Sequence, residues 1–179
     1  MLFVVEASAQ MTAQGSPAMG LKAAETTTLR FDQTPAQCLT EQNFNYTAFV
    51  NLGYLMWGAL AVGTCEAVKA YCIEYANERT AFGEPISHRQ SIAFMIADMA
   101  IEIDAMRLLV CNAASLAETG QNFQREAYLA RLLCAEKAIK IASDGVQILG
   151  GHGFTKEHPV ERWYRDLRAI AIVHSGLHA

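Results

Sequence analysis

Residues 58–79, "GALAVGTCEAVKAYCIEYANER", carry the strongest structural signal in the chain. Small and apolar residues recur there at steps of three and four, namely Gly58, Ala61, Val62, Cys65, Val68, Cys72 and Tyr75. This spacing places them on one face of an α-helix. The pattern therefore predicts one long helix that starts after about residue 43 and ends near Arg79, with this face packed against other helices.

Two more long helices and a shorter one are predicted downstream. Pro85 stops the first helix, and Ser87 with Gln90 has the spacing of a capping box for the second. A third helix is expected from about Phe123, with a buried face at Leu132, Ala135, Ile139, Ala142, Val146 and Leu149. Pro159 suits the first turn of a fourth helix. Short loops favour antiparallel neighbours, so the sequence predicts a mainly α fold, an up-down four-helix bundle.

The first 42 residues have a different character. "LFVV" at residues 2–5 and "TTTLRF" at 26–31 are rich in β-branched and aromatic residues, and "SPAMG" at 16–20 is typical of a turn. Two or three strands do not form a stable sheet alone, so this segment must pack on something else. We therefore divide the chain into a short β segment, 1–42, and a helical bundle domain, 43–179.

Composition excludes several classes of protein. The chain has 179 residues, of which 52% are hydrophobic and 18% charged, which is typical of a packed globular protein. A net charge of -4 argues against a nucleic-acid partner. The apolar run "LGYLMWGALAVG" at 52–63 is shorter than the roughly 20 residues that span a bilayer, so no membrane segment is predicted. We expect a cytoplasmic protein, or one of the mitochondrial matrix in a eukaryote.

Neither the cysteines nor the terminal histidines predict a metal site. The five cysteines, at 38, 65, 72, 111 and 134, include no Cys-x-x-Cys pair and are expected to be small core residues. The closing "IVHSGLHA" places His174 and His178 four residues apart. In zinc proteases of that spacing a glutamate follows the first histidine, but Ser175 follows here and no third ligand is evident. We predict no metal.

Two motifs lie at the ends of the predicted helices: "ERTAFGEPISHRQ" at 78–90 and "QILGGHGFTKEHPVERWYRDLR" at 147–168. Each alone is explained by a turn, a cap or a helix end. In this order, on long helices, they resemble the C-terminal helical domain of acyl-CoA dehydrogenases. Upstream, "LFVVEA" and "MGLKAAETTTLRFD" are similar to the last strands of that family's middle β-domain. The resemblance implies that residues 1–42 are a remnant of that β-domain.

The resemblance also implies a function. It suggests an FAD-dependent oxidoreductase of fatty acid metabolism, in which a carboxylate removes the α proton of an acyl-CoA thioester and FAD accepts the β hydride. It implies sister subunits in a dimer or tetramer, an electron-accepting flavoprotein as a possible partner, and a helical domain that contacts the FAD of its neighbour. The implied FAD contacts are Arg79, Phe82, Gln90, Gln147, Gly150 and Gly151. A guanidinium suits a pyrophosphate and glycines allow close backbone approach, whereas Gln90 could serve only as a helix cap.

The implied catalytic position carries no carboxylate. Counting without gaps from Arg165 and Asp166 puts His174 where many family members have their catalytic glutamate. A second branch of the family has its glutamate at the position of Gly53, and a substrate-side arginine falls on Tyr54. Neutral imidazole can act as a base at pH 7, but it becomes charged when it takes the proton.

Three hypotheses remain open. The chain is part of an acyl-CoA dehydrogenase with His174 in place of glutamate, or a non-catalytic helical subunit or fragment that assembles with a complete one. The third is a stand-alone helical binding protein or a remnant. The family's N-terminal helical domain and most of its β-domain have no counterpart in the sequence. The chain alone is therefore expected to be inactive.

Overall fold

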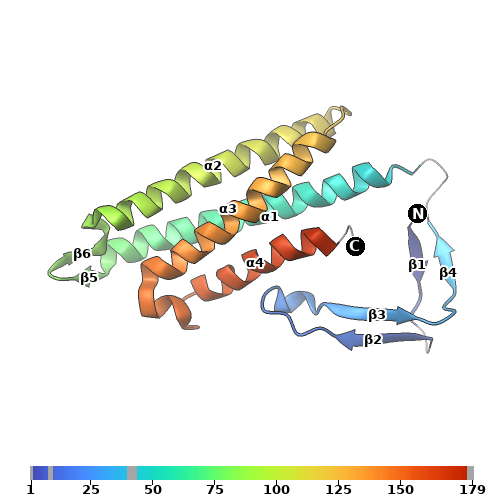
Figure 1. Cartoon of the computed structure of the whole chain (residues 1–179), viewed down its shortest axis with the longest axis horizontal. Helices are drawn as coiled ribbons and strands as arrows, with labels where there is room; N and C mark the ends of the chain where they lie inside the picture. Colours follow the sequence, from blue (N-terminus) through green and yellow to red (C-terminus); the bar gives the residue numbers. More distant parts are fainter. Residues whose placement is uncertain (1, 8–9, 40–43, 177–179) are drawn as a thin grey trace.

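Four helices form a bundle with a small β segment beside it in the computed structural model (Figure 1). The structure describes residues 2–7, 10–39 and 44–176, with side chains up to residue 172. The helices are α1 (Tyr46–Glu78), α2 (Gln90–Glu118), α3 (Gln124–Leu149) and α4 (Val160–Gly176). The predicted mainly α, four-helix fold is confirmed.

Helix α1 is the central element of the bundle. The side chain of Asn45 accepts a hydrogen bond from the Ala48 amide (2.9 Å) and caps its first turn. Six of the seven residues on its predicted inner face are buried, and Tyr75 is half-buried. By length and composition α1 could also cross a membrane, a criterion that the core helix of a bundle meets equally.

The predicted capping box of α2 is wrong. A 3-10 turn, η2 (Ile86–His88), takes up Ser87, and α2 begins two residues later than a cap at Ser87 would require. Arg89 occupies the N-cap position in an extended conformation and supplies no side-chain hydrogen bond. The turn that follows Pro85 has therefore moved Ser87 away from the free amides of the helix.

The predicted inner face of α3 is only partly right, since Ala142 and Leu149 are buried but the other four residues are not. Leu132 is 47% exposed, and Ala135, Ile139 and Val146 are only half-buried. The residues that face the core are mostly small, and the buried set is Ala127, Ala130, Cys134, Ala138, Ile141, Ala142, Gly145, Ile148 and Leu149. A Cβ added to Gly145 would lie 2.6 Å from Cγ1 of Val68. Close approach of α3 to α1 therefore selects small residues over bulky ones.

A tight hairpin connects α1 to α2. Strands β5 (Thr80–Ala81) and β6 (Glu84–Pro85) pair antiparallel around Phe82 and Gly83. Both turn residues have positive φ, 57° and 87°. Two-residue hairpins favour such turns because their twist matches that of the strands.

The N-terminal segment forms two antiparallel pairs. Strand β1 (Phe3–Val5) pairs with β4 (Ala36–Cys38), and β2 (Met11–Gly15) pairs with β3 (Thr27–Phe31). A 3-10 turn, η1 (Lys22–Ala24), separates β2 from β3. These strands are mostly exposed, so their pairing alone supplies little buried apolar area.

Helix α4 holds this segment in place. The Leu21 amide donates a hydrogen bond to Oδ1 of Asp166 (2.7 Å), and Nη1 of Arg165 donates to the Met19 carbonyl (2.8 Å). Between them, Gly20 packs directly on the backbone of Arg165. The expectation that the β segment packs on something else is confirmed, and the Arg-Asp pair is the site of contact.

Burial sets the reactivity of the cysteines, all five of which lie among the described residues and form no disulfide there. Burial raises the thiol pKa of Cys65 and Cys72 to about 12 and that of Cys134 to about 11. Cys38 and Cys111 are exposed. We expect iodoacetamide at pH 8 to alkylate the two exposed thiols at least about tenfold faster than the other three, because the thiolate is the nucleophile. Peptide mass spectrometry over time measures this, with the unfolded chain as control. Equal native rates would contradict the described core.

Candidate functional site

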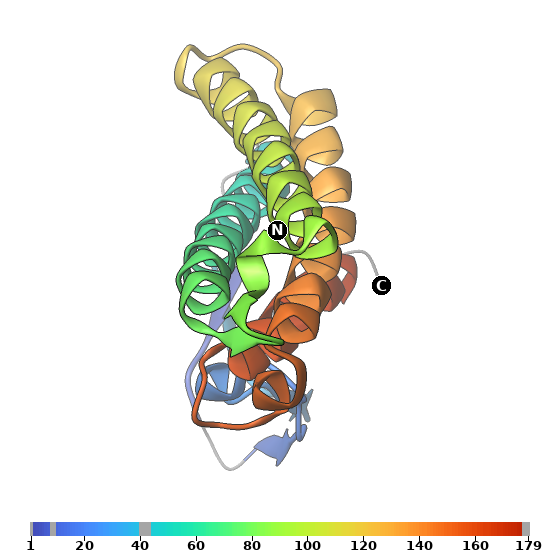
Figure 2. The ribbon, with the colours of Figure 1, turned by 90° about the vertical axis from the view of Figure 1, so that its left-hand side faces the viewer.

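Most of the predicted cofactor residues lie on two connections at one end of the bundle (Figure 2). The α1–α2 hairpin follows Arg79 and carries Phe82, while the α3–α4 connection begins with a 3-10 turn, η3 (Gly150–Phe154). In an up-down bundle α1 and α3 run in the same direction, so their ends meet. Segments about 70 residues apart in sequence are thereby brought together.

A cavity of about 390 Å³ lies between these connections, and we name it the glycine pocket. Its lining consists of Tyr75, Arg79, Ile86, Ile148, Leu149, Gly150, Gly151 and His152. The Arg79 backbone is fixed, since its amide donates to the Tyr75 carbonyl and its carbonyl accepts from the Ile86 amide (both 2.9 Å). Its guanidinium forms no hydrogen bond or ion pair with any residue that the structure describes. Such a group suits an anionic ligand, phosphate above all.

The two glycines of this pocket differ in why a glycine is needed at their position. Gly150 has φ +59°, a conformation that favours glycine. Gly151 has no such requirement, and an added Cβ would meet nothing within 4 Å. Backbone conformation therefore explains glycine at 150, whereas neither conformation nor packing of the described chain explains it at 151. The exposed Gly151 backbone beside the unpaired Arg79 guanidinium would allow an anionic ligand to approach closely.

The other predicted cofactor residues lie around this pocket. Gln147 and Gly150 both line a neighbouring cavity of about 400 Å³ on the α4 side. Phe82 is 96% exposed, with the Arg89 guanidinium 5.3 Å from its ring centroid. Gln90 is exposed in the first turn of α2. Neither Phe82 nor Gln90 lines the glycine pocket.

A cluster of two tyrosines and two histidines beside Arg79 was not predicted from the sequence. The Tyr75 hydroxyl lies 2.7 Å from Nδ1 of His152, and the Tyr71 hydroxyl lies 2.7 Å from Nδ1 of His158. The two imidazole rings are 5.3 Å apart. These residues line a cavity of about 350 Å³ together with Glu74, Glu78 and Arg79. Tyrosines four apart on a helix were the available signal, but their partners depend on how the bundle closes.

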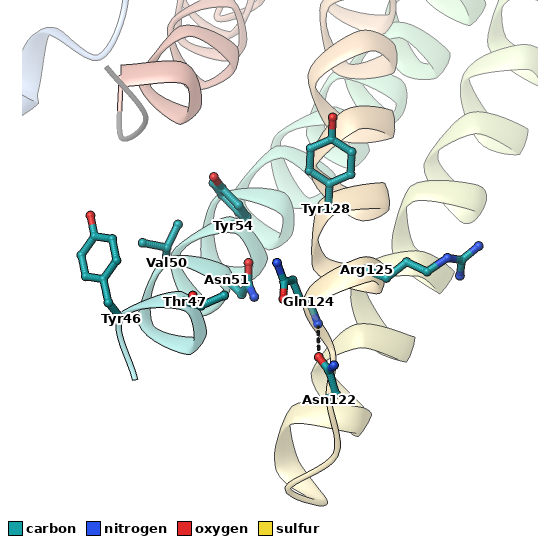
Figure 3. A pocket seen from close by; sticks show the side chains of 9 residues that line it. All are labelled: Tyr46, Thr47, Val50, Asn51, Tyr54, Asn122, Gln124, Arg125 and Tyr128. Carbon is teal, nitrogen blue, oxygen red and sulfur yellow. Dashed lines mark hydrogen bonds between the residues drawn. The ribbon is translucent and has the colours of Figure 1, made fainter. Parts of the chain in front are cut away.

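A second missed feature is a cavity of about 550 Å³ near the start of α1 (Figure 3). We name it the Asn51 pocket, and it is lined by Tyr46, Thr47, Val50, Asn51, Tyr54, Asn122, Gln124, Arg125 and Tyr128. Asn51 is only 5% exposed, and its side chain has no hydrogen-bond partner among the described residues. It faces Gln124 across the gap between α1 and α3 (Figure 3). A buried amide without a partner is costly, so this pocket is suited to a polar ligand.

Tyr54 forms one wall of the Asn51 pocket and is 3% exposed. The Arg131 guanidinium from α3 lies 4.7 Å from its ring centroid, and Nη1 lies 3.4 Å from its hydroxyl. A guanidinium stacked on an aromatic ring is a stabilising pair. A positive group therefore stands beside position 54 even though the residue there is tyrosine.

His174 belongs to the last turns of α4, and its side chain lies outside the described residues, as does all of His178. Helix α4 runs from the η3 end of the bundle toward the N-terminal half of α1 (Figure 1). Position 174 is 14 residues beyond Val160, about 21 Å along the helix axis. It is therefore remote from the glycine pocket. Among the described residues, no group of three or more His, Cys, Asp or Glu side chains could hold a metal ion.

Comparison with known proteins identifies the family. The sequence profile described as "Acyl-CoA dehydrogenase, C-terminal domain" matches residues 46–176. The chain belongs to the acyl-CoA dehydrogenase family. An acyl-CoA dehydrogenase of Bacillus subtilis is 38% identical over 160 residues, which are 86% of this chain and 42% of that protein. The caffeyl-CoA reductase-Etf complex subunit CarC of Acetobacterium woodii is 42% identical over 123 residues, 69% of this chain and 32% of that protein.

Solved structures of the acyl-CoA dehydrogenase family match the fold. Butyryl-CoA dehydrogenase from Megasphaera elsdenii is 31% identical with a TM-score of 0.83, covering 93% of this chain and 45% of that one. A glutaryl-coenzyme A dehydrogenase in complex with glutaryl-CoA is 29% identical with a TM-score of 0.85, covering 93% and 44%. The match thus extends beyond the helices into the β segment. The chain spans less than half the length of the relatives it matches.

Proposed function

We propose that this chain contributes to flavin-dependent dehydrogenation of an acyl-CoA, with the glycine pocket as a contact for FAD. The observation that carries the proposal is the unpaired Arg79 guanidinium beside the open backbone of Gly151 in one cavity. Arg79 would neutralise the pyrophosphate, and the glycine segment would let the nucleotide approach its backbone. When bound, FAD supplies the acceptor for the β hydride of the substrate.

The glycine pocket and position 174 belong to different active centres in this proposal. The glycine pocket lies at the end of the bundle where α4 starts, and position 174 is about 21 Å along the helix axis from that start at Val160. In one active centre the base removes the proton from the α carbon while the hydride acceptor takes the hydride from the adjacent β carbon. The separation supports an arrangement in which the glycine pocket serves the FAD of a sister subunit.

The Asn51 pocket is the proposed place for the polar arm of the acyl-CoA. A carboxamide can donate and accept hydrogen bonds, and the pantetheine arm of coenzyme A carries amides and a hydroxyl. Asn51 is buried, lacks a partner among the described residues and faces Gln124. Two amide side chains on facing helices could therefore align this arm while tyrosine rings cover it.

His174 is the proposed acceptor of the α proton, and it is less suited to this step than a carboxylate. A carboxylate loses its charge when it takes the α proton, whereas neutral imidazole gains one. A new charge in an apolar cleft is disfavoured by desolvation. The substitution also supports a second candidate, a helical subunit that assembles with a complete acyl-CoA dehydrogenase and lends it cofactor contacts without catalysis.

The absorption spectrum of the purified chain with FAD tests both candidates, alone and mixed with a full-length relative such as the Megasphaera elsdenii enzyme. We expect a flavin band near 450 nm that co-elutes with the chain and is lost in Arg79→Ala. Arg30→Ala is the control, because Arg30 is exposed in β3 and lines neither the glycine pocket nor the Asn51 pocket. Absence of the band in both preparations would refute cofactor binding.

The base at position 174 has its own test. His174→Glu should bleach the bound flavin with butyryl-CoA about tenfold faster than the unmodified chain, because a carboxylate becomes neutral on taking the proton. Stopped-flow absorbance measures the rate, and His178→Glu is the control. No gain from His174→Glu, or an equal gain from His178→Glu, would show that position 174 is not where the base acts.

A further inference from the structure

One hydroxyl group holds both flanks of the Gly150–Gly151 pair. Tyr75 Oη donates to the Leu149 carbonyl (3.4 Å) and lies 2.7 Å from Nδ1 of His152. Leu149 immediately precedes the glycine pair and His152 immediately follows it. A side chain of α1 therefore closes the ends of a two-residue segment that lies at the end of α3.

These contacts match one tautomer of His152. A tyrosine hydroxyl has one hydrogen, so if Tyr75 donates to the Leu149 carbonyl it accepts from His152. The tautomer with its hydrogen on Nδ1 satisfies both bonds. The His152 carbonyl in turn accepts from the amide (3.1 Å) and the hydroxyl (3.0 Å) of Thr155. The segment is thus fixed at its start by Tyr75 and beyond its end by Thr155.

Apart from the bond of the Gly150 amide to the Gln147 carbonyl and the backbone of η3, no side chain packs on the glycine pair. Gly151 has no neighbour within 4 Å of a Cβ position, and both glycines are exposed. Glycine has the largest conformational freedom of any residue, so an unsupported pair would sample many backbone conformations. Tyr75 lies four residues before Arg79, the C-cap of α1, whose amide donates to the Tyr75 carbonyl. The hydroxyl therefore sets where the glycine backbone lies relative to the guanidinium.

We propose that Tyr75 is a positioning residue for the cofactor site, acting through the backbone of Gly150 and Gly151. This inference rests on the proposed function of the glycine pocket. Tyr71 provides a matched comparison one turn earlier on α1. Its hydroxyl also pairs with a histidine, His158 (2.7 Å), but His158 does not flank the glycine pair.

The test compares Tyr75→Phe with Tyr71→Phe, each of which removes one hydroxyl and keeps the ring. Hydrogen exchange of residues 150–153 in the ligand-free full chain should be about fivefold faster in Tyr75→Phe and unchanged in Tyr71→Phe. The Kd for FAD, in the preparation where the unmodified chain binds it, should rise about fivefold in Tyr75→Phe alone. Thermal unfolding checks that both variants fold; each loses one tyrosine–histidine bond, and Tyr75→Phe also loses the bond to the Leu149 carbonyl.

Each outcome decides a different point. Unchanged exchange in Tyr75→Phe overturns the inference, because the hydroxyl then does not fix the segment. Faster exchange with an unchanged Kd also overturns it, since the segment's order then has no effect on the cofactor. An equal rise of Kd in both variants would indicate general loosening of this end of the bundle and would likewise overturn it. If the unmodified chain binds no FAD, the proposed function fails, while the exchange data still decide whether Tyr75 pins the glycines.

Discussion

Gly20→Ala is expected to detach the β segment from α4 and to lower the free energy of unfolding by about 3 kcal/mol. An added Cβ would overlap the carbonyl group of Arg165, and a backbone carbonyl cannot rotate away as a side chain can. The two segments must then separate. Separation breaks the bond from the Leu21 amide to Asp166 and the bond from Arg165 to the Met19 carbonyl, both of which involve charged groups.

Gly15→Ala is the matched control, because it lies in β2 of the same segment and an added Cβ there would meet nothing within 4 Å. Urea unfolding measures stability, and limited proteolysis reports whether residues before α1 become accessible. Gly20→Ala should be cleaved faster in this region, and Gly15→Ala should behave as the unmodified chain. Equal behaviour of both variants would show that the contact with α4 contributes nothing.

The contact between residues 19–21 and α4 also affects the position of residue 174. Arg165 and Asp166 lie nine and eight residues before position 174 on the same helix. Holding residues 19–21 against them fixes the part of α4 that leads to this position. The Arg-Asp pair was recognised in the sequence as a family motif, but its task could not be predicted. That task depends on which backbone meets it after folding.

Helix positions were largely predictable, and helix faces only partly. Helix α1 buries the face that was predicted, because small and apolar residues recur on that face at helical spacing. On α3 the bulky residue Leu132 is exposed, while Ala138 and Gly145 are buried. Hydrophobicity ranks residues by apolar area, but closely packed helices select them by size. A sequence pattern cannot tell these two requirements apart until the helix spacing is known.

The candidate site was predictable where separated motifs agree. Arg79, Gly150 and Gly151 were predicted from the resemblance, and the structure brings them into one cavity. The Tyr75–His152 pair was missed because a hydrogen bond between residues 77 positions apart leaves no local pattern. The Asn51 pocket was missed for a similar reason, since its significance comes from burial without a partner.

Gly151→Val is expected to weaken FAD binding roughly 100-fold, about 2.7 kcal/mol, without a measurable loss of stability. The position has open space around an added Cβ, so the folded chain accepts a side chain. That side chain would project into the cavity shared with Arg79 and hold the nucleotide away from both the backbone and the guanidinium. Flavin titration and thermal unfolding of the same preparations measure the two effects.

Gly63→Val is the matched control, because Gly63 is exposed on α1 and an added Cβ there also meets nothing within 4 Å. It should leave both FAD affinity and stability near those of the unmodified chain. Gly150→Val should instead lose stability, because φ +59° is strained for a β-branched residue. Substitution of a glycine that the backbone conformation requires thus lowers the stability of the fold. Substitution of a glycine that only a ligand requires lowers FAD affinity and leaves stability unchanged. Unaltered FAD binding in Gly151→Val would mean that no ligand approaches this backbone, and the glycine pocket would lose its proposed role.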